Sequence, residues 1–394
     1  MIIVRTEQTW IKSHQIISSL CHLSKNLYNE SNYIVRQELF KKNKWIRYNK
    51  LYHSVKTSKN YLQLPAQTAQ QVLKVLDKNW KSFFAASKEW KKAQSKFNGK
   101  PRPPRYKPKN GEFILVFTNQ QVKLKDNLLK FPKKVSFKLQ TRLPDKTNIR
   151  EVRIIPKGIG YMVEIVYQKE INPKPLNKDS IIAIDLGVRN LITMVNNNGL
   201  KPFVIKGGVV KSINQYYNKE KARIQSVYDR QEIKTGKAMQ KLTIKRNRKI
   251  HDYFHKISQK IIQYCVFHDI GTVVIGYNPD WKQNCHLGKR NSQNFVTIPY
   301  HRLVNQLGYK AEEKGITVIK QEESYSSKCS FLDNEPIKHH KKYLGRRITR
   351  GLFKSTTGTI INADVNGAYN ILKKAFLNAV EADRIEDVGL HPSR

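Results

Sequence analysis

Two aspartates stand at the ends of predicted elements, where carboxylates often do chemistry. Asp185 closes the apolar run "SIIAID" and precedes Gly187, whose missing Cβ would let a phosphate backbone approach closely. Asp364 stands in "INADVNGAYNILKKA", where the last helix is expected to begin. Each position also suits an ordinary structural role, a strand-end turn for the first and an N-cap for the second. The functional interpretation therefore depends on whether the fold brings the two together.

The chemistry that such a pair would serve is metal-assisted phosphodiester cleavage. Two Mg²⁺ ions about 4 Å apart can activate an attacking water and stabilise the leaving oxygen. Hard cations of this kind require carboxylate oxygens, and a cluster of carboxylates is repulsive without them. We therefore expect Asp185 and Asp364 to be catalytic residues and Mg²⁺ ligands.

The order of elements after residue 179 predicts that arrangement. Three successive strands are expected near 181–186, 190–196 and 202–206, followed by a long basic helical region over about 210–268. A strand (271–275), a helix (about 299–314), a strand (316–321) and a final helix from about 364 complete the chain. This βββ-α-β-α-β-α order is that of the ribonuclease-H-like α/β fold, in which the first strand and last helix lie side by side.

The first half of the chain has a different pattern. A short strand over about 1–10 precedes a helix whose apolar residues, from Ile16 to Ile34, recur at spacings of three, four and seven. A second helix begins near Ala66. The segment "SKFNGKPRPPRYKPKNGE" (95–112) breaks the helical pattern with prolines and glycines, and strands with hairpin turns follow over about 112–170.

The charge of the chain points to a polyanionic partner. It carries 73 Lys and Arg against 30 Asp and Glu, a net charge of +43. A compact fold with so large a charge repels itself, and nucleic acid neutralises it. Clustered cations in three places are the predicted nucleic-acid-binding residues: Lys100, Arg102, Arg105, Lys107, Lys245, Arg246, Arg248, Lys249, Arg346, Arg347 and Arg350.

Other features narrow the setting. The longest apolar runs are strand-sized, so no membrane partner is expected, and "MIIVRTEQTW" lacks the apolar core of a signal peptide. The four cysteines are scattered without a C-x-x-C pair, which fits a reducing cytoplasm rather than a disulfide framework.

Several motifs together resemble the TnpB family, the transposon-encoded RNA-guided RuvC nucleases related to type V CRISPR effectors. They are "AIDLGVRNLIT", "GYNPDWKQN", "IPYHRL", "ESYSSK", "GRRITRGLF" and "INADVNGAYNILKKA", and the likeness covers nearly the whole chain. The resemblance implies a guide RNA derived from the transposon end, a double-stranded DNA target beside a short motif, Mg²⁺-dependent cleavage, and a location in the prokaryotic cytosol or nucleoid.

The resemblance also implies a domain order. Residues 1–10 would supply the first strand of a β-barrel wedge domain, and 11–95 a helical recognition domain. Residues 96–178 would complete the wedge domain, and 179–394 would form the RuvC nuclease domain. Residues 324–360 would be a zinc-ribbon-like insert within the nuclease domain.

That insert departs from the family pattern. Most members carry four zinc-binding cysteines, whereas here the four positions are Cys329, Leu332, Lys354 and Thr357. One thiolate cannot hold a tetrahedral zinc ion, and the adjacent His339 and His340 make a poor pair of replacement ligands. We therefore expect a degenerate insert that folds without zinc, anchored by the apolar "FL" at 331–332.

A second departure concerns the remaining catalytic acid. Most members of the family carry Glu at the strand end where this chain has Gly276. Asp280 is four residues further, up to about 13 Å away in an extended chain, and is a weak substitute. Glu322 and Glu323 end the neighbouring strand, about 4.8 Å away, and only one of them can face the metal ions. We favour Glu323, and a subset of the family similarly has its second acid on this strand.

Three functions fit the sequence. The first is an RNA-guided DNA endonuclease that uses Asp185, Glu323 and Asp364. The second is a nuclease-inactive RNA-guided repressor, against which the retention of Asp185 and Asp364 argues. The third is a strand-transfer transposase, against which the resemblance of the N-terminal half to guide-binding regions argues. The sequence leaves the oligomeric state, the guide and the adjacent motif open.

Overall fold

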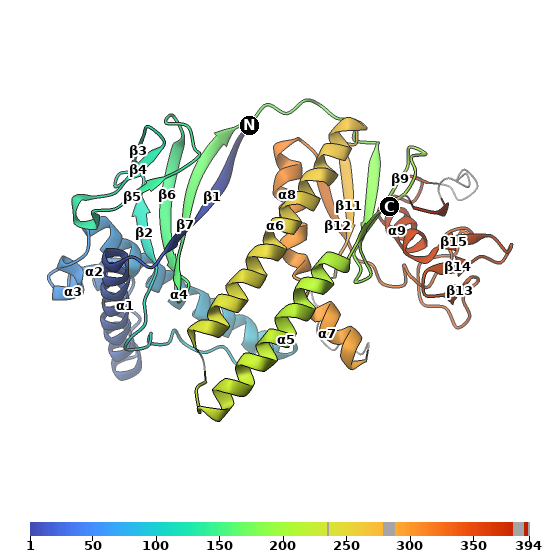
Figure 1. Ribbon diagram of the computed structural model, residues 1–394. Coiled ribbons are helices and arrows are strands. Elements are labelled where there is room, and N and C mark those ends of the chain that lie inside the picture. The colour runs from blue at the N-terminus through green and yellow to red at the C-terminus, as the bar shows by residue number, and fades with distance from the viewer. Residues whose placement is uncertain (235, 279–287, 381–389, 393–394) are drawn as a thin grey trace. The chain divides into compact units, whose positions relative to one another are not determined.

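The computed structural model describes residues 1–394 except 235, 279–287, 381–389 and 393–394. The chain divides into two compact units, Met1–Ile171 and Asn172–Arg394, whose elements are drawn in Figure 1. Each unit is described by itself. None of the helices in the described residues is long and apolar enough to cross a membrane.

Two long helices dominate the helical part of the first unit. α1 (Gln15–Lys42) and α4 (Ala66–Lys92) are joined by α2 (Tyr48–Val55) and α3 (Lys59–Leu62), and a 3₁₀ turn (Gln94–Lys96) follows. The predicted apolar stripes bury Leu20 and Leu27 on α1 and Trp80 on α4, as the helical spacing requires.

The strands of the first unit form two open antiparallel sheets. β1 (Ile2–Lys12), β7 (Gly160–Glu170), β6 (Asn148–Pro156) and β2 (Leu115–Thr118) pair in that order. β3 (Lys123–Lys125), β4 (Leu128–Lys130) and β5 (Lys138–Gln140) form the second sheet. The expected barrel is therefore wrong in one respect: within residues 1–171, β1 and β2 are the unpaired edges of an open sheet.

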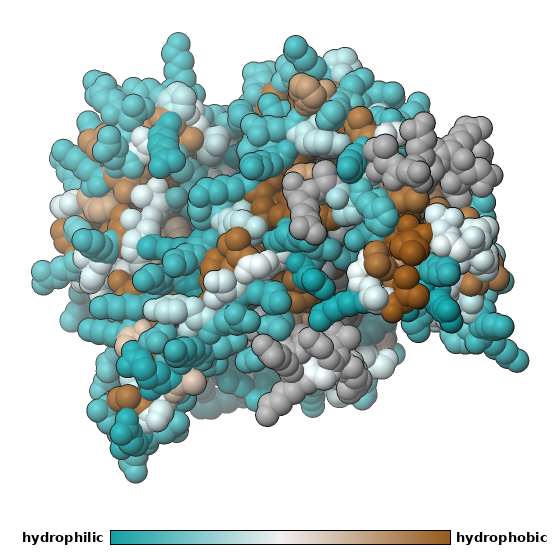
Figure 2. All heavy atoms as spheres, turned by 45° about the vertical axis from the view of Figure 1, so that its right-hand side comes forward, coloured by the Kyte–Doolittle hydropathy of each residue, from teal (hydrophilic) through white to brown (hydrophobic). Residues whose placement is uncertain are grey.

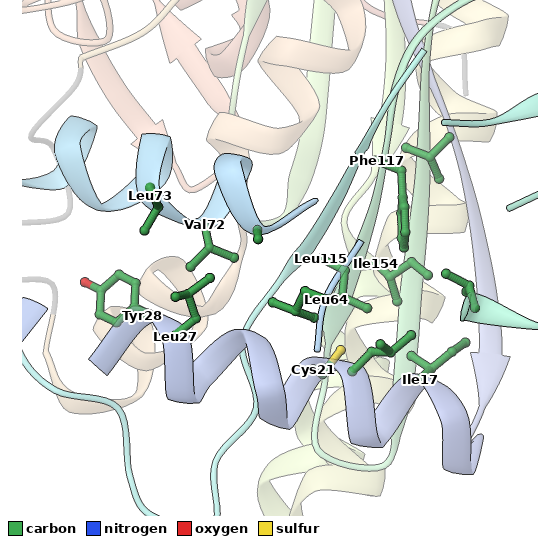
Figure 3. Packing of buried hydrophobic residues seen from close by; sticks show 14 of the residues in the cluster. Ile17, Cys21, Leu27, Tyr28, Leu64, Val72, Leu73, Leu115, Phe117 and Ile154 are labelled. Atoms are coloured by element: carbon green, nitrogen blue, oxygen red, sulfur yellow. The ribbon is translucent and has the colours of Figure 1, made fainter. Parts of the chain in front are cut away.

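The helices and the larger sheet of this unit share one core. Figure 3 shows Ile17, Cys21 and Leu27 of α1 facing Leu73 of α4 and Leu115 of β2. Burying a side chain of this size stabilises a fold by about 1.5–3 kcal/mol. The helices and the strands therefore form a single folding unit.

The second unit is built on a mixed five-stranded sheet with the order β10-β9-β8-β11-β12. Its strands are β8 (Ile181–Asp185), β9 (Asn190–Asn196), β10 (Phe203–Lys206), β11 (Thr272–Gly276) and β12 (Thr317–Gln321). β8, β11 and β12 are parallel neighbours, whereas β9 runs antiparallel to β8 and to β10. This is the strand order expected for the ribonuclease-H-like arrangement.

Helices cover both faces of this sheet, and residue alternation decides which face each side chain joins (Figure 1). Ile182 and Ile184 pack with α6 (Lys237–Phe267) and α8 (Tyr300–Glu313) on one face. Ile181 and Ala183 pack with α9 (Ala363–Ala375) on the other. Because Asp185 continues the odd-numbered series, it lies on the α9 face.

Five further elements belong to this unit. α5 (Gly208–Arg230) packs on α6, and α7 (Lys289–Thr297) precedes α8. Between β12 and α9 the strands β13 (Arg346–Thr349), β14 (Leu352–Lys354) and β15 (Ile360–Asn362) form a small sheet. The basic stretch between β12 and α9 thus includes a β-hairpin, β13–β14.

Candidate functional site

Asp185 and Gly276 lie side by side at the ends of two parallel strands. Ile184 pairs with Ile275 in the β8–β11 register, so the two following residues stand at the same level. Val274 packs on the α9 face, and Gly276 therefore points to the same face as Asp185. The predicted juxtaposition of the first strand and the last helix is present.

The space above Gly276 is occupied by the carboxylate of Glu323. A Cβ placed on Gly276 would lie 2.8 Å from Glu323 Oε2 and 2.5 Å from Ile371 Cδ1 of α9. Contacts this short do not occur in real proteins, so a larger residue at 276 requires the side chains of Glu323 and Ile371 to shift. The glycine leaves room for an acid that reaches across from the next strand.

The two neighbouring glutamates have different environments. Glu322 accepts a hydrogen bond from the backbone N–H of Ser324 (2.7 Å) and forms an ion pair with Lys374 of α9, and its side chain is 52% exposed. Glu323 Oε2 is buried and has no hydrogen-bond partner within the described residues. Of the two alternatives left by the sequence, Glu323 is the one directed towards Asp185. Asp280 lies outside the described residues.

The pKa values of the two acids reflect burial and mutual repulsion. Burial, followed by the charge of Asp364, raises the pKa of Asp185 to about 7; the Leu186 N–H and Arg347 oppose this. Burial, followed by the charges of Asp185 and Glu322, raises the pKa of Glu323 to about 8. The site is therefore electrostatically unfavourable when both acids are ionised and no cation is present.

Asp364 begins the first turn of α9 but is not its N-cap. The N-cap is Asn362, whose side chain accepts hydrogen bonds from the N–H groups of Asp364 (3.0 Å) and Val365 (3.2 Å). The Asp364 carboxylate is thereby free of the capping role and instead accepts from Asn190 Nδ2 at 2.7 Å. Arg347 lies 4.0 Å from its other oxygen.

The donor set suits hard divalent cations. Asp185 is electrostatically coupled to Asp364 on one side and to Glu323 on the other. Among the described residues, no three His, Cys, Asp or Glu side chains converge on a single ion position. The arrangement is instead two carboxylate pairs that share Asp185, with one buried carboxylate oxygen unpartnered. Carboxylate oxygens of this kind are the ligands that hard divalent cations prefer.

A cationic groove opens beside Asp364. Its volume is about 390 Å³, and it lies between the β8–β9 turn and the β13–β14 hairpin. Four cations line it together with the carboxylate: Arg189, Lys206, Arg347 and Arg350. Arg347 and Arg350 belong to the predicted nucleic-acid-binding set, and Arg346 is exposed on the same hairpin.

The predicted cations of α6 separate into two groups. Lys245 and Lys249 are exposed and border a cleft of about 220 Å³ between α5 and α6, beside Tyr216 and Tyr217. Arg248 is exposed too.

Arg246 of the same helix is turned inwards. Its guanidinium donates to Asn214 Oδ1 (2.8 Å) and to the carbonyl of Thr297 (2.5 Å). We correct its expected role: Arg246 ties α6 to α5 and to the end of α7, and its donors are used inside the protein.

The proline-rich segment is held against α1 by hydrogen bonds. We call residues 101–114 the strap. Polar side chains of α1 hold its backbone: Lys25 donates to the carbonyl of Lys109 (2.7 Å), and Asn29 donates to that of Lys107 (2.9 Å). Arg102 and Arg105 are exposed on the strap, and Lys100 is exposed just before it.

Lys107 of the strap is half-buried over aromatic rings. Its Nζ lies 5.0 Å from the ring centroids of both Tyr28 and Phe113. This cation–π position anchors the strap to α1. The Lys107 ammonium is therefore less available to phosphates than Arg102 or Arg105.

On the face drawn in Figure 2, hydrophilic side chains predominate, with smaller hydrophobic areas between them.

The zinc-ribbon-like insert is held by hydrogen bonds and apolar packing. Phe331 is buried and stacks on Tyr369 of α9 with ring centroids 4.8 Å apart. Asp333 accepts hydrogen bonds from Thr356, which joins the two segments that carry the four positions named above. The Cys329 thiol is buried and faces the carbonyls of Pro336 and Lys338 at 3.5 and 3.6 Å.

Three residues of the site were missed by sequence reasoning. They are Asn190, which binds Asp364; Tyr300, whose hydroxyl donates to the Gly187 carbonyl at 2.8 Å; and Lys374, which holds Glu322. Asn190 stands close after Asp185 in "DLGVRN", and this closeness was the available signal, whereas Tyr300 was marked only by its place in the motif "IPYHRL". Nothing in the local sequence marked Lys374.

Comparison with known proteins places two segments in described families. Residues 164–282 match the family OrfB_IS605, described as a probable transposase. Residues 300–371 match the Cas12f1-like TNB domain. The two matches cover the sheet, the site and the insert between β12 and α9.

Whole-sequence relatives are distant. A TnpB-like protein, ORF457, of Acidianus two-tailed virus is 25% identical over 90% of this chain and 82% of its own length. The TnpB-like protein MJ0751 of Methanocaldococcus jannaschii is 24% identical over 54% of this chain and 74% of its own. The CRISPR-associated endodeoxyribonuclease Cas12f1 of Sulfoacidibacillus thermotolerans is 28% identical over 54% of this chain and 49% of its own.

Solved structures share the fold at low identity. A Cas12f1–sgRNA–target DNA complex matches with a TM-score of 0.54 and 14% identity over 92% of this chain and 83% of the other. The mini-RNA-guided endonuclease CRISPR-Cas_phi3 matches with a TM-score of 0.51 and 10% identity over 98% and 93%. The chain is thus a mixed α/β protein with one segment that matches the OrfB_IS605 family and another that matches the Cas12f1-like TNB domain, on a fold similar to that of these structures.

Proposed function

We propose that the protein is a transposon-encoded, RNA-guided DNA endonuclease of the TnpB type. The observation that carries this proposal is that Asp185, at the end of β8, interacts electrostatically with both Glu323 and Asp364, while a buried Glu323 oxygen has no partner among the described residues. The relatives named TnpB-like and the Cas12f1 endodeoxyribonuclease support the same class. The guide RNA would come from the transposon end, and the target would be double-stranded DNA beside a short motif.

The three acids would hold two Mg²⁺ ions. When bound, these ions would supply activation of a water and charge stabilisation of the leaving oxygen. Asp185 interacts electrostatically with both Asp364 and Glu323, so the three carboxylates would hold the ions together. Gly276 keeps the space that the Glu323 carboxylate occupies.

The chain's own cations would place the substrate. Arg347 and Arg350 line the groove beside Asp364, where they can contact the phosphates flanking the scissile bond. Arg102 and Arg105 on the strap, with Lys100 beside it, and Lys245, Arg248 and Lys249 on α6 would contact phosphates elsewhere. These contacts would position the nucleic acid without reading its sequence.

We assign roles to the domains on the same basis. The helices within 11–95 would form the recognition domain, the strands within 1–10 and 96–178 the wedge domain, and 179–394 the nuclease domain. The expected setting is the prokaryotic cytosol or nucleoid, where both transposon RNA and DNA are present.

The test is guided plasmid cleavage with the RNA encoded at the transposon end, together with a target-binding measurement. We expect RNA to co-purify and the plasmid to be cut only with Mg²⁺ and a matching guide. Binding without cutting by the wild-type protein would establish the alternative, a nuclease-inactive repressor. Absence of any bound RNA, with joining of DNA ends instead, would favour a strand-transfer transposase.

A further inference from the structure

Asn190 connects the β8–β9 turn to the candidate site. It is the first residue of β9, and its Nδ2 donates to Asp364 Oδ2 at 2.7 Å. This bond fixes the orientation of the amide, because the flipped amide would place two oxygens at that distance. The amide therefore holds one Asp364 oxygen and leaves the other to face Arg347.

The other atom of the amide has no partner. Asn190 Oδ1 is buried and accepts no hydrogen bond within the described residues. Asn190 also lines the cationic groove beside Asp364. A buried acceptor is normally satisfied, so an unpaired one at a groove indicates a missing donor. Phosphate oxygens are acceptors and cannot supply that donor, whereas a water molecule can.

The backbone around Asn190 is rigidly held. The hydroxyl of Tyr300 on α8 donates to the Gly187 carbonyl (2.8 Å), and Gly187 N–H donates to the Leu191 carbonyl (3.3 Å). A Cβ on Gly187 would lie 2.6 Å from the Asn190 carbonyl oxygen, so only glycine fits this turn. The turn therefore presents Asn190 to Asp364 in one position.

We propose that Asn190 is a positioning residue: its Nδ2 orients the Asp364 carboxylate for metal binding, and its Oδ1 accepts a hydrogen bond from a water in the groove. The expected effect of Asn190 on cleavage rests on the proposed function, whereas its expected effect on metal affinity does not. Partners that orient metal ligands typically contribute about 10–100-fold to metal affinity or activity.

The experiment compares Asn190→Ala with Asn196→Ala in the RNA-bound protein. Asn196 is the last residue of the same strand, and its side chain only supports the 196–200 turn, by bonds to Leu200 and Asn198. We would measure Mn²⁺ affinity by electron paramagnetic resonance, the half-saturating Mg²⁺ concentration for cleavage, target binding and melting temperature. Asn190→Thr, which suits a strand, replaces the alanine variant if that does not fold.

We expect Asn190→Ala to weaken Mn²⁺ binding and raise the half-saturating Mg²⁺ concentration by about 10-fold or more, with target binding unchanged. Asn196→Ala should lower the melting temperature and leave both metal readouts unchanged. Equal shifts in the two variants, or none in Asn190→Ala, would overturn the proposal. If the wild type does not cleave, the proposed function fails, and the Mn²⁺ titration alone decides the role of Asn190.

Discussion

At the scale of residues, the central feature is a carboxylate supplied from a neighbouring strand. Glu323 reaches over Gly276, and Lys374 holds Glu322 away from the site. The glycine and the lysine together select which of two adjacent glutamates faces Asp185. The same substitution at the two positions is therefore a well-matched comparison, because Glu322 and Glu323 differ in environment but not in chemistry.

Glu323→Gln should lower guided cleavage by at least about 10²-fold, since members of a metal cluster act as a unit. Glu322→Gln should cleave within a few-fold of the wild type, because its carboxylate is exposed and paired with Lys374. Target binding should survive in both variants, since phosphate contacts and guide pairing do not need this carboxylate. Normal cleavage by Glu323→Gln would show that the acid at this site comes from elsewhere.

The raised pKa values of Asp185 (about 7) and Glu323 (about 8) make a second prediction. The folded protein keeps protons that the unfolded chain releases near pH 4, so without metal these groups stabilise the fold below pH 4. That contribution is lost as pH rises towards 8. Mg²⁺ binds the ionised acids, so it should raise the melting temperature more at pH 8 than at pH 5.5.

Thermal melting with and without Mg²⁺ at the two pH values measures this difference. Glu323→Gln removes one of the titrating groups and provides the control, with a smaller Mg²⁺-dependent increase at pH 8. An increase that is equal at both pH values would contradict the assignment of these acids as cation ligands.

At the scale of elements, the insert between β12 and α9 is held together by side-chain contacts around a small sheet, β13–β14–β15. Phe331 packs on Tyr369, and Asp333 bonds to Thr356 across the two segments where thiolates would otherwise meet. These contacts connect the segments that a zinc ion usually joins. The hairpin β13–β14 carries Arg347 to the site, 4.0 Å from Asp364.

We therefore predict no structural zinc, and elemental analysis should find well under one zinc per chain. Chelators should leave the melting temperature unchanged, and Cys329→Ser should change it little because the thiol only faces two carbonyls. Stoichiometric zinc that resists dialysis would show that other ligands replace the missing thiolates.

The elements also show which features of the fold and the site could be predicted from the sequence. Apolar periodicity and the strand order were sufficient to predict that β11 and β12 are parallel neighbours, and Gly276 indeed pairs with Gln321. Period-two alternation left the choice between Glu322 and Glu323 open, because the contact with Lys374 that decides it is 52 residues distant. The inward turn of Arg246 likewise depends on Asn214 and Thr297, which no local pattern reveals.

At the scale of the whole molecule, the net charge of +43 dominates. Exposed cations on the strap, on α6 and on the β13–β14 hairpin share this charge among surfaces in both units. Counterions released from nucleic acid on binding make such an association depend steeply on salt.

Affinity for the guide RNA should therefore fall steeply with salt, by about 10³–10⁵-fold between about 50 and 200 mM if about six to ten phosphates are contacted. Fluorescence anisotropy with labelled RNA at several salt concentrations gives the slope of log affinity against log salt concentration. Arg102→Gln should reduce the slope by about one contact. Arg246→Gln should lower the melting temperature and leave the slope unchanged, because that guanidinium is bonded within the protein. A slope near zero in the wild type would exclude the electrostatic account.

The pairing of β1 with β7 has a consequence for how the chain is made. Ile2 pairs with Glu170, so the strand synthesised first needs the strand synthesised last in its unit. At about 5–20 residues per second, β1 stays without its partner β7 for on the order of ten seconds or more during translation. The α1–α4 helices can form meanwhile, since their contacts are local, whereas the sheet closes only after residue 170 leaves the ribosome. Biosynthesis of the first unit is therefore expected to end, rather than begin, with its N-terminal strand.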